Sequence, residues 1–89
     1  MTVVIIARGF ASGATCPHEG QYLKSFDFDA YDGQGWGEFT ESLKRAKRFP
    51  DKMAAAAFWK QQSRTRPLRP DGEPNRPLTA LTVEIREVA

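Results

Sequence analysis

The sequence predicts an α+β fold: a small antiparallel or mixed sheet of three to four strands with two consecutive helices on one face, in the order ββ(β)ααβ. Three observations predict it. Apolar strand patterns lie at residues 2–8 and 78–88, and the only long stretch with helical character, residues 40–63, separates them. A chain of 89 residues, 40% of them hydrophobic, suits a single domain over residues 1–89.

The first strand is predicted at residues 2–8, TVVIIAR. Residues 3–6 are continuously apolar, which is typical of a strand that is buried on both faces and therefore lies in the middle of its sheet. A loop follows at residues 9–20, which contain glycines and a proline that interrupt regular structure. Loops of this length are often functional or mobile.

A second strand is predicted at residues 21–28 and a short third strand at residues 36–40. Between them, residues 29–37 contain three glycines and must turn. Alternation in the second strand places Tyr22, Phe26 and Phe28 on one face and Leu23, Ser25 and Asp27 on the other.

Two helices are predicted within the central stretch because Pro50 cannot continue a helix that precedes it. The first helix covers residues 42–48. The second begins after Asp51, whose carboxylate can accept from free backbone amides as an N-cap. Of the adjacent aromatics Phe58 and Trp59, one is expected to enter the core and the other to cap a sheet edge or to lie in an interface. The face expected to cover the sheet consists of Met53, Ala54, Ala57 and Phe58, with Gln61 at its edge.

A surface arm rich in proline and arginine is predicted at residues 64–77, because four prolines exclude both a helix and a central strand. Residues 69–72, Arg-Pro-Asp-Gly, have the composition of a type I turn. The spacing of Pro67 and Pro70 also fits a polyproline ligand, but a structural loop explains it better. The last strand follows at residues 78–88, beside the first strand, with Leu81, Val83 and Ile85 on its buried face.

The net charge of +2 conceals an uneven distribution along the chain. Residues 1–43 carry two basic and six acidic residues, a net charge of −4, whereas residues 44–76 carry ten basic and three acidic residues, a net charge of +7. A basic segment of this kind attracts polyanions, and arginine beside an aromatic ring suits phosphate contact and base stacking. The candidate binding residues are Trp59, Lys60, Arg64, Arg66, Arg69 and Arg76.

Nucleic-acid binding through Lys44–Arg76 is therefore an alternative function, although the sequence carries no helix-turn-helix, RNP or zinc-finger signature. The same arginines can instead pair with acidic side chains of the first half, such as Asp27, Asp29 and Asp32.

No catalytic set, metal site or cofactor site is predicted, and the chain is not expected to be an enzyme. Cys16 and His18 lie close in sequence, but the chain has no further Cys or His to complete a metal site. No third group is evident that would orient them for catalysis. They are interpreted as part of an ordinary loop.

The acidic residues of the turn region resemble a calcium loop only in part. If Asp27 were the first position, Asp29 and Glu38 would be the third and twelfth. Tyr31 would then take the place of an oxygen ligand, and Asp32 the place of the required glycine. The sequence therefore indicates a solvated acidic turn.

The chain is expected to be cytoplasmic and not to enter a membrane. Cys16 is the one cysteine, which suits a reducing compartment. No apolar run approaches the ~20 residues that span a bilayer. Residues 3–7 are too short for a signal-peptide core, and no basic residue precedes them.

Three segments, GQYLKSFDFD at residues 20–29, AKRF at residues 46–49 and RPLRPDGEPNRPLTA at residues 66–80, resemble small proteins encoded in phages and prophages of proteobacteria. The shared pattern is YLKSFD followed by RPDGxPNRPLTA. Phe28 stands where these proteins have Pro after SFD, and Pro50–Asp51 replaces a more acidic start of the Ala-rich helix. The resemblance implies an accessory role and no assigned activity. Together with the small size and the exposed arm, it predicts a non-catalytic domain that binds a partner protein or itself.

Overall fold

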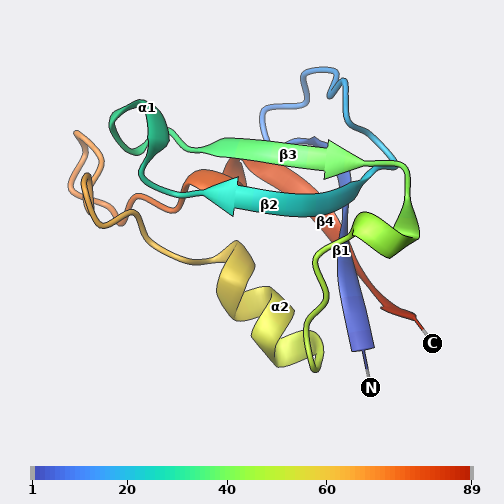
Figure 1. Cartoon of the computed structure of the whole chain (residues 1–89). Coiled ribbons are helices and arrows are strands. Elements are labelled where there is room, and N and C mark those ends of the chain that lie inside the picture. The colour runs from blue at the N-terminus through green and yellow to red at the C-terminus, as the bar shows by residue number, and fades with distance from the viewer. Residues whose placement is uncertain (1, 89) are drawn as a thin grey trace.

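A computed structural model describes residues 2–88 of the chain as a four-stranded antiparallel sheet with a short α-helix on one face (Figure 1). The strand order is β3-β2-β1-β4. The α+β class and the antiparallel sheet are thus confirmed, and β1 lies centrally beside β4, as predicted. The strands are β1 (Thr2–Phe10), β2 (Tyr22–Asp27), β3 (Trp36–Thr40) and β4 (Leu81–Val88).

The helical elements are α1 (Ala30–Gly33), the 3₁₀ turn η1 (Leu43–Arg45), the helix α2 (Lys52–Trp59) and the 3₁₀ turn η2 (Pro77–Ala80). In the described part of the chain, α2 is the only helix of two turns. No helix among residues 2–88 is long and apolar enough to cross a membrane.

The centre of β1 is buried on both faces, as its continuous apolar run predicts. Val3 and Ile5 belong to the main core beneath α2. Val4 and Ile6 belong to a smaller cluster on the opposite face, completed by Ala46 and by partly buried neighbours. The sheet is therefore covered on both sides although the chain is small.

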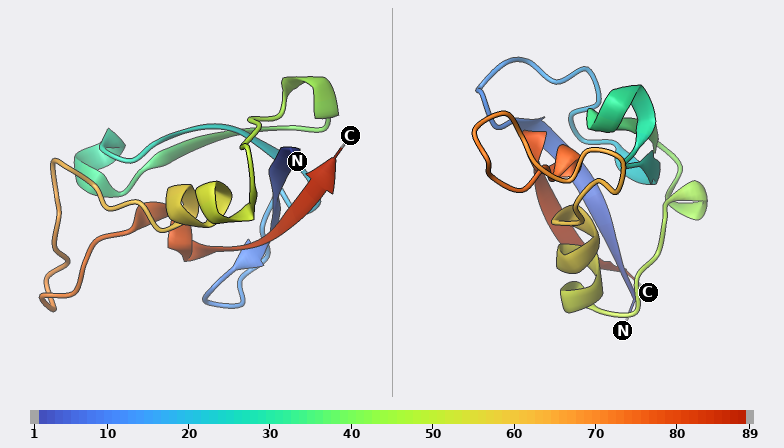
Figure 2. Two further views of the ribbon diagram at one scale, coloured as in Figure 1. Left: turned by 90° about the horizontal axis from the view of Figure 1, so that it is seen from below. Right: turned by 90° about the vertical axis from the view of Figure 1, so that its left-hand side faces the viewer.

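The sheet consists of two antiparallel ribbons that separate from one another away from a shared corner (Figures 1 and 2). β1 and β4 pair along their whole length, from Thr2 opposite Val88 to Phe10 opposite Leu81. β1 and β2, in contrast, pair as strands at one position, where Ile6 lies opposite Tyr22. The β2–β3 ribbon thus leaves the end of the β1–β4 ribbon free to line a groove.

The predicted faces of the second strand are wrong for Leu23 and Tyr22. Leu23 packs in the same core as Phe26 and Phe28, whereas Tyr22 packs in the smaller cluster on the opposite face. The cause is an irregularity in the β2–β3 register between Leu23 and Ser25. An extra residue at a β-bulge reverses the alternation beyond it, so side chains on either side of the bulge share one face.

The predicted helix at residues 42–48 does not form beyond the single turn η1. Residues 46–49 are instead extended, and Phe49 exchanges two backbone hydrogen bonds with Val3, at 3.0 and 2.9 Å. The Lys47 amide also donates to the Leu23 carbonyl at 2.9 Å. Pairing with the sheet satisfies these backbone groups and buries Ala46 and Phe49, which outweighs a favourable helix propensity because an isolated helix this short is only marginally stable.

The second predicted helix is α2, and Asp51 is its N-cap, with Oδ1 accepting from the Ala54 amide at 2.8 Å. Its predicted buried face is partly wrong, because Met53 is 83% exposed and Ala57 is exposed while Ala55 is buried. The helix is rotated by about one residue from the expected position.

The rotation of α2 follows from the aromatic pair at its end. Phe58 lies against the rings of Phe28 and Phe49, at centroid distances of 5.1 and 5.3 Å. Trp59 donates from Nε1 to the carbonyl of Leu81 on β4 at 3.1 Å. The expected division between a core aromatic and an edge aromatic is thus confirmed.

The arm at residues 64–77 is not a single extended strand but a hairpin-like loop. The Gly72 amide donates to the Arg69 carbonyl at 2.9 Å, which confirms the predicted turn, and Gly72 adopts a φ of +85° that glycine tolerates. The Arg69 amide donates to the Glu73 carbonyl at 2.8 Å, and the Asn75 amide to the Pro67 carbonyl at 2.9 Å. These bonds bring the two halves of the arm together and exclude a polyproline helix.

Candidate functional site

The arm lies against the turn between β2 and β3, which contains α1, at one end of the molecule (Figures 1 and 2). Asp29 makes the first connection. Its Oδ1 accepts from the Ser63 hydroxyl at 2.9 Å and from the amides of Arg64 and Thr65 at 2.7 and 3.1 Å. One carboxylate oxygen thus gathers three donors from the start of the arm, and charge-assisted bonds of this kind are among the stronger ones in proteins.

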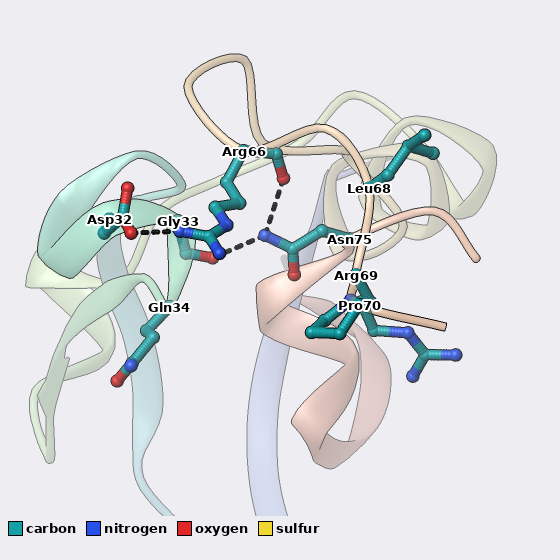
Figure 3. Close-up of a pocket in the computed structure, with 8 residues that line it drawn as sticks. All are labelled: Asp32, Gly33, Gln34, Arg66, Leu68, Arg69, Pro70 and Asn75. Atoms are coloured by element: carbon teal, nitrogen blue, oxygen red, sulfur yellow. Dashed lines mark hydrogen bonds and ion pairs between the residues drawn. The ribbon is translucent and has the colours of Figure 1, made fainter. Parts of the chain in front are cut away.

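Asn75 makes the second connection (Figure 3). Its Nδ2 donates to the carbonyls of Gly33 at 2.7 Å and Arg66 at 2.9 Å, and so joins the turn to the first half of the arm. Arg66 also forms an ion pair with Asp32. Both side chains of that pair are exposed, so it contributes little stability, and the hydrogen bonds of Asn75 and Asp29 fix the contact.

The turn has an unusual backbone conformation. Tyr31 and Asp32 have φ values of 52° and 58°, and Gly33 follows at 84°. The left-handed region costs a non-glycine residue roughly 1–2 kcal/mol, and such strain persists only where the surroundings impose it. The arm contacts the turn directly after these residues, where buried Gly33 lies beneath Arg66 and Asn75.

The strained turn presents aromatic side chains to solvent. Tyr31 is 67% exposed and Trp36 is 57% exposed, and their rings meet edge to face with centroids 5.9 Å apart. On the arm, Leu68 is 54% exposed. A cavity of about 380 Å³ lies between turn and arm and is lined by Asp32, Gly33, Gln34, Arg66, Leu68, Arg69, Pro70 and Asn75 (Figure 3).

We call this end of the molecule the turn–arm surface. It is defined by five exposed side chains from the turn with β3 and from the arm: Tyr31, Trp36, Arg66, Leu68 and Arg69.

Four of the six predicted binding residues meet at one hollow of about 340 Å³ beside the arm, namely Trp59, Lys60, Arg69 and Arg76. Glu73 lines the same hollow, and Arg69 pairs with Asp71 at 3.2 Å. Arg66 lies instead at the cavity between turn and arm, paired with Asp32, as the sequence allowed. Arg64 lines neither space and is tied to Asp29 through its backbone amide.

The remaining basic residues of the +7 segment do not extend this hollow. The turn η1 and the arm lie at opposite ends of the molecule in both figures. Lys47, which follows η1, lies over the rings of Phe49 and Phe58 at 5.6 and 5.1 Å. The basic segment of the sequence is therefore divided into two separate groups on the surface.

The Cys16–His18 pair is built into the fold. Cys16 is buried in the core, and the His18 ring stacks on Phe39 with centroids 4.6 Å apart, with Nδ1 3.2 Å from the side-chain oxygen of Gln21. Within residues 2–88, no group of three or more His, Cys, Asp or Glu side chains is placed to hold a metal ion.

The acidic residues that suggested a calcium loop have separate partners. Asp27 accepts from the Asp29 amide at 3.0 Å, and Glu38 accepts from the Ser25 hydroxyl at 3.0 Å. Asp29 and Asp32 both face the arm, through hydrogen bonds and an ion pair. The arrangement is a structural turn that holds the arm.

A second, larger hollow of about 440 Å³ lies between the two ribbons, and we call it the ribbon groove. Its walls come from β3, the end of β1, the loop after β1 and the segment that enters β4. It is lined by Phe10, His18, Phe26, Gln34, Gly35, Trp36, Gly37, Glu38, Phe39, Pro77, Ala80 and Leu81.

The donors around Asp29 predict a pH effect on stability. Hydrogen bonds from the Thr65 and Arg64 amides, then from the Ser63 hydroxyl, hold the pKa of the Asp29 carboxyl below its usual value of 3.8. A depressed pKa in the folded state gives stability that is present above 3.8 and is lost as the pH falls through the folded-state pKa. We therefore expect the free energy of unfolding to decrease below about pH 4.

Denaturant unfolding of the wild type and Asp29→Asn between pH 2 and pH 6 measures this effect. Protonation of Glu84 also lowers the free energy of unfolding, because hydrogen bonds from Arg8 and then Arg86 lower the pKa of its carboxyl in the folded state. The difference between wild type and variant therefore isolates Asp29. A stability difference that does not change between pH 6 and pH 2 would contradict the assigned role.

Residues that the sequence did not identify carry much of this site. From the sequence, Tyr31 was notable only as a mismatch to a calcium loop, and Asn75 was not a candidate site residue. Their importance depends on contact between segments more than thirty positions apart, which sequence periodicity does not reveal. One signal was present: a large exposed aromatic within an acidic, glycine-rich turn is unusual and points to a contact surface.

Comparison with models of known protein families gives no match. Comparisons with curated proteins and with solved structures give no significant match either.

Proposed function

We propose that this chain is a small non-catalytic accessory protein that binds a partner protein through the turn–arm surface. The observation that carries the proposal is the exposure of Tyr31, Trp36 and Leu68 at one end of the molecule, beside Arg66 and Arg69. Tyrosine, tryptophan and arginine are the residue types that dominate binding energy at protein interfaces. Exposed apolar groups gathered in this way commonly mark an interaction site.

The construction of the surface supports the same proposal. Asp29 and Asn75 hold turn and arm together in the unbound protein, so ordering the loops is not left to the binding step. The backbone strain at Tyr31 is maintained although Tyr31 makes no core contact, and strain of that kind concentrates at functional sites.

The resemblance to phage and prophage proteins supports placing this binding function in an infected or lysogenic host. Action in the cytoplasm is part of the proposal, supported by the single cysteine.

Affinity capture from a proteobacterial lysate tests the proposal with paired variants. The bait Leu68→Ser/Arg69→Ser removes one apolar and one arginine side chain from the turn–arm surface. The bait Leu43→Ser/Arg45→Ser makes the same chemical change at the exposed turn η1. We expect a protein captured by wild type to bind the first variant at least about tenfold more weakly, since hot-spot truncations cost over 1 kcal/mol each.

The control variant should retain the captured protein at the wild-type level. Equal capture by the wild type and Leu68→Ser/Arg69→Ser, or equal loss from both variants, would exclude the turn–arm surface as the binding site.

Binding of single-stranded nucleic acid is the second candidate, supported by the meeting of Trp59, Lys60, Arg69 and Arg76 at one hollow. Stacking on an aromatic ring beside cationic side chains is the usual means of sequence-tolerant binding. Glu73 in the hollow and the separation of the two basic groups weigh against it. Electrophoretic titration with single-stranded DNA at low and high salt tests this candidate. Binding at low salt that is lost at high salt would support it, because phosphate contacts weaken steeply with salt.

A further inference from the structure

The ribbon groove is mainly apolar and lies beside an open edge of the sheet. Phe10, Phe26, Phe39 and Leu81 contribute to its walls. Its volume of about 440 Å³ falls in the range of sites that accept a ligand or a large side chain. Each of these side chains also packs against or within the main core, so the groove is a continuation of that core to the surface.

β3 forms one wall of this groove and is an edge strand, paired only with β2. Natural edges are commonly protected from further pairing by proline, by charged side chains and especially lysine, by bulges, by short strands or by a covering element. The five residues of β3, WGEFT, include neither proline nor lysine. An extended chain could therefore continue the sheet beyond β3 and place every second side chain toward the groove.

The charge around β3 selects among such chains. Residues 19–41 contain six acidic side chains and a single basic one, Lys24. Asp29 and Asp32 are engaged by the arm. Glu38 and Glu41 lie on and just after β3, and neither has an ion-pair partner among residues 2–88. The edge therefore carries uncompensated negative charge.

We propose that the β3 edge and the ribbon groove bind an extended, basic segment of another protein, which adds a strand to the sheet and inserts one large apolar side chain into the groove. A second copy of this chain fits less well, because β3 beside β3 would bring Glu38 and Glu41 of both copies together, and like charges on neighbouring strands destabilise pairing. The site shares Trp36 with the turn–arm surface but extends from it along β3, and it requires none of the arm side chains Arg66, Leu68 and Arg69.

Three synthetic peptides test the proposal by titration into ¹⁵N-labelled protein. The first is acetyl-Arg-Thr-Arg-Phe-Arg-Thr-amide. The second replaces its arginines with glutamates, and the third is the basic peptide with an N-methyl group on every residue, so that neither edge can donate to a neighbouring strand. We expect the basic peptide to shift the amides of β3 and the Trp36 indole saturably. The acidic peptide should bind at least tenfold more weakly, and the N-methylated peptide should not bind.

Protein variants locate the contact. Ala80→Phe fills the groove from an exposed position, so we expect at least tenfold weaker binding of the basic peptide. Glu38→Lys should weaken the basic peptide and strengthen the acidic one. Glu73→Lys, the same change on the arm, should have no effect on either. Leu68→Ser/Arg69→Ser should also bind normally, which separates this site from the turn–arm surface.

Four results would overturn the proposal: equal affinity for the basic and acidic peptides, shifts confined to the arm, no shift at millimolar peptide, or unchanged binding by Ala80→Phe. A concentration-dependent dimer that Ala80→Phe abolishes would likewise overturn it and assign the edge to a second copy of the chain.

Discussion

Replacement of Gly33 with alanine is expected to lower the free energy of unfolding by about 3 kcal/mol, the sum of a left-handed backbone penalty and a steric clash. Gly33 has a φ of 84°, and a Cβ there would lie 2.9 Å from Nδ2 of Asn75 and closer still to Cβ of Arg66. The backbone on both sides is held by the same contacts, so neither neighbour can move without breaking the junction of turn and arm.

Gly13→Ala is the matched control for this prediction. Gly13 has a φ of 87°, but no atom lies within 4 Å of the position that an alanine Cβ would take, so only the backbone penalty of about 1–2 kcal/mol applies. Urea unfolding of both variants, fitted with one common slope of the free energy of unfolding against urea concentration, gives the two losses of stability. A cost for Gly33→Ala no greater than that for Gly13→Ala would show that the turn and arm are not packed together.

Leu78→Ala is expected to destabilise the protein by about 3 kcal/mol, within the range measured for leucine-to-alanine changes at buried sites. Leu78 is 1% exposed and belongs to the main core. It directly follows the arm, on the 3₁₀ turn η2 that leads into β4. Its burial therefore fixes the end of the arm as well as the core, and its loss leaves a cavity that the short η2 backbone cannot fill.

The exposed Leu43 provides the comparison. Leu43→Ala removes the same atoms from a side chain that is 37% exposed and should lower the free energy of unfolding by only about 1 kcal/mol. Thermal and urea unfolding of the two variants test the assignment. Similar costs for Leu43→Ala and Leu78→Ala would place Leu78 outside the core.

The parts of the fold that were predictable depend on local patterns. The continuous apolar run of β1 indicated burial on both faces, and the alternation in β4 indicated one buried face. The residues at positions 69–72 indicated a turn. In each case the side chains that determine the structure are neighbours in sequence, and the predicted features are present.

The errors arise where distant segments decide the outcome. Residues 42–48 have the composition of a helix, but the two backbone hydrogen bonds between Phe49 and Val3 hold the chain after η1 in an extended form. The bulge near Leu23 depends on the register with β3, which no pattern within β2 reveals. The rotation of α2 depends on the hydrogen bond from Trp59 to β4.

The candidate site was predictable in the same uneven way. The arm and its arginines were evident, and pairing with the acidic turn was foreseen for Arg66 and Asp32. The stronger connections were not, because they use backbone amides and the side-chain amide of Asn75. The exposed aromatics Tyr31 and Trp36 are assigned to a surface by the contact between turn and arm, which the sequence does not reveal.

Residue-resolved amide hydrogen exchange measures whether turn and arm form one prebuilt surface in the unbound protein. We predict protection of four of the arm amides that donate within this unit, those of Arg64, Thr65, Arg69 and Asn75. In Asp29→Asn, protection of Arg64 and Thr65 should fall while that of β1 is retained. Exchange of all four amides in the wild type at the rate of an unstructured peptide would contradict a prebuilt surface.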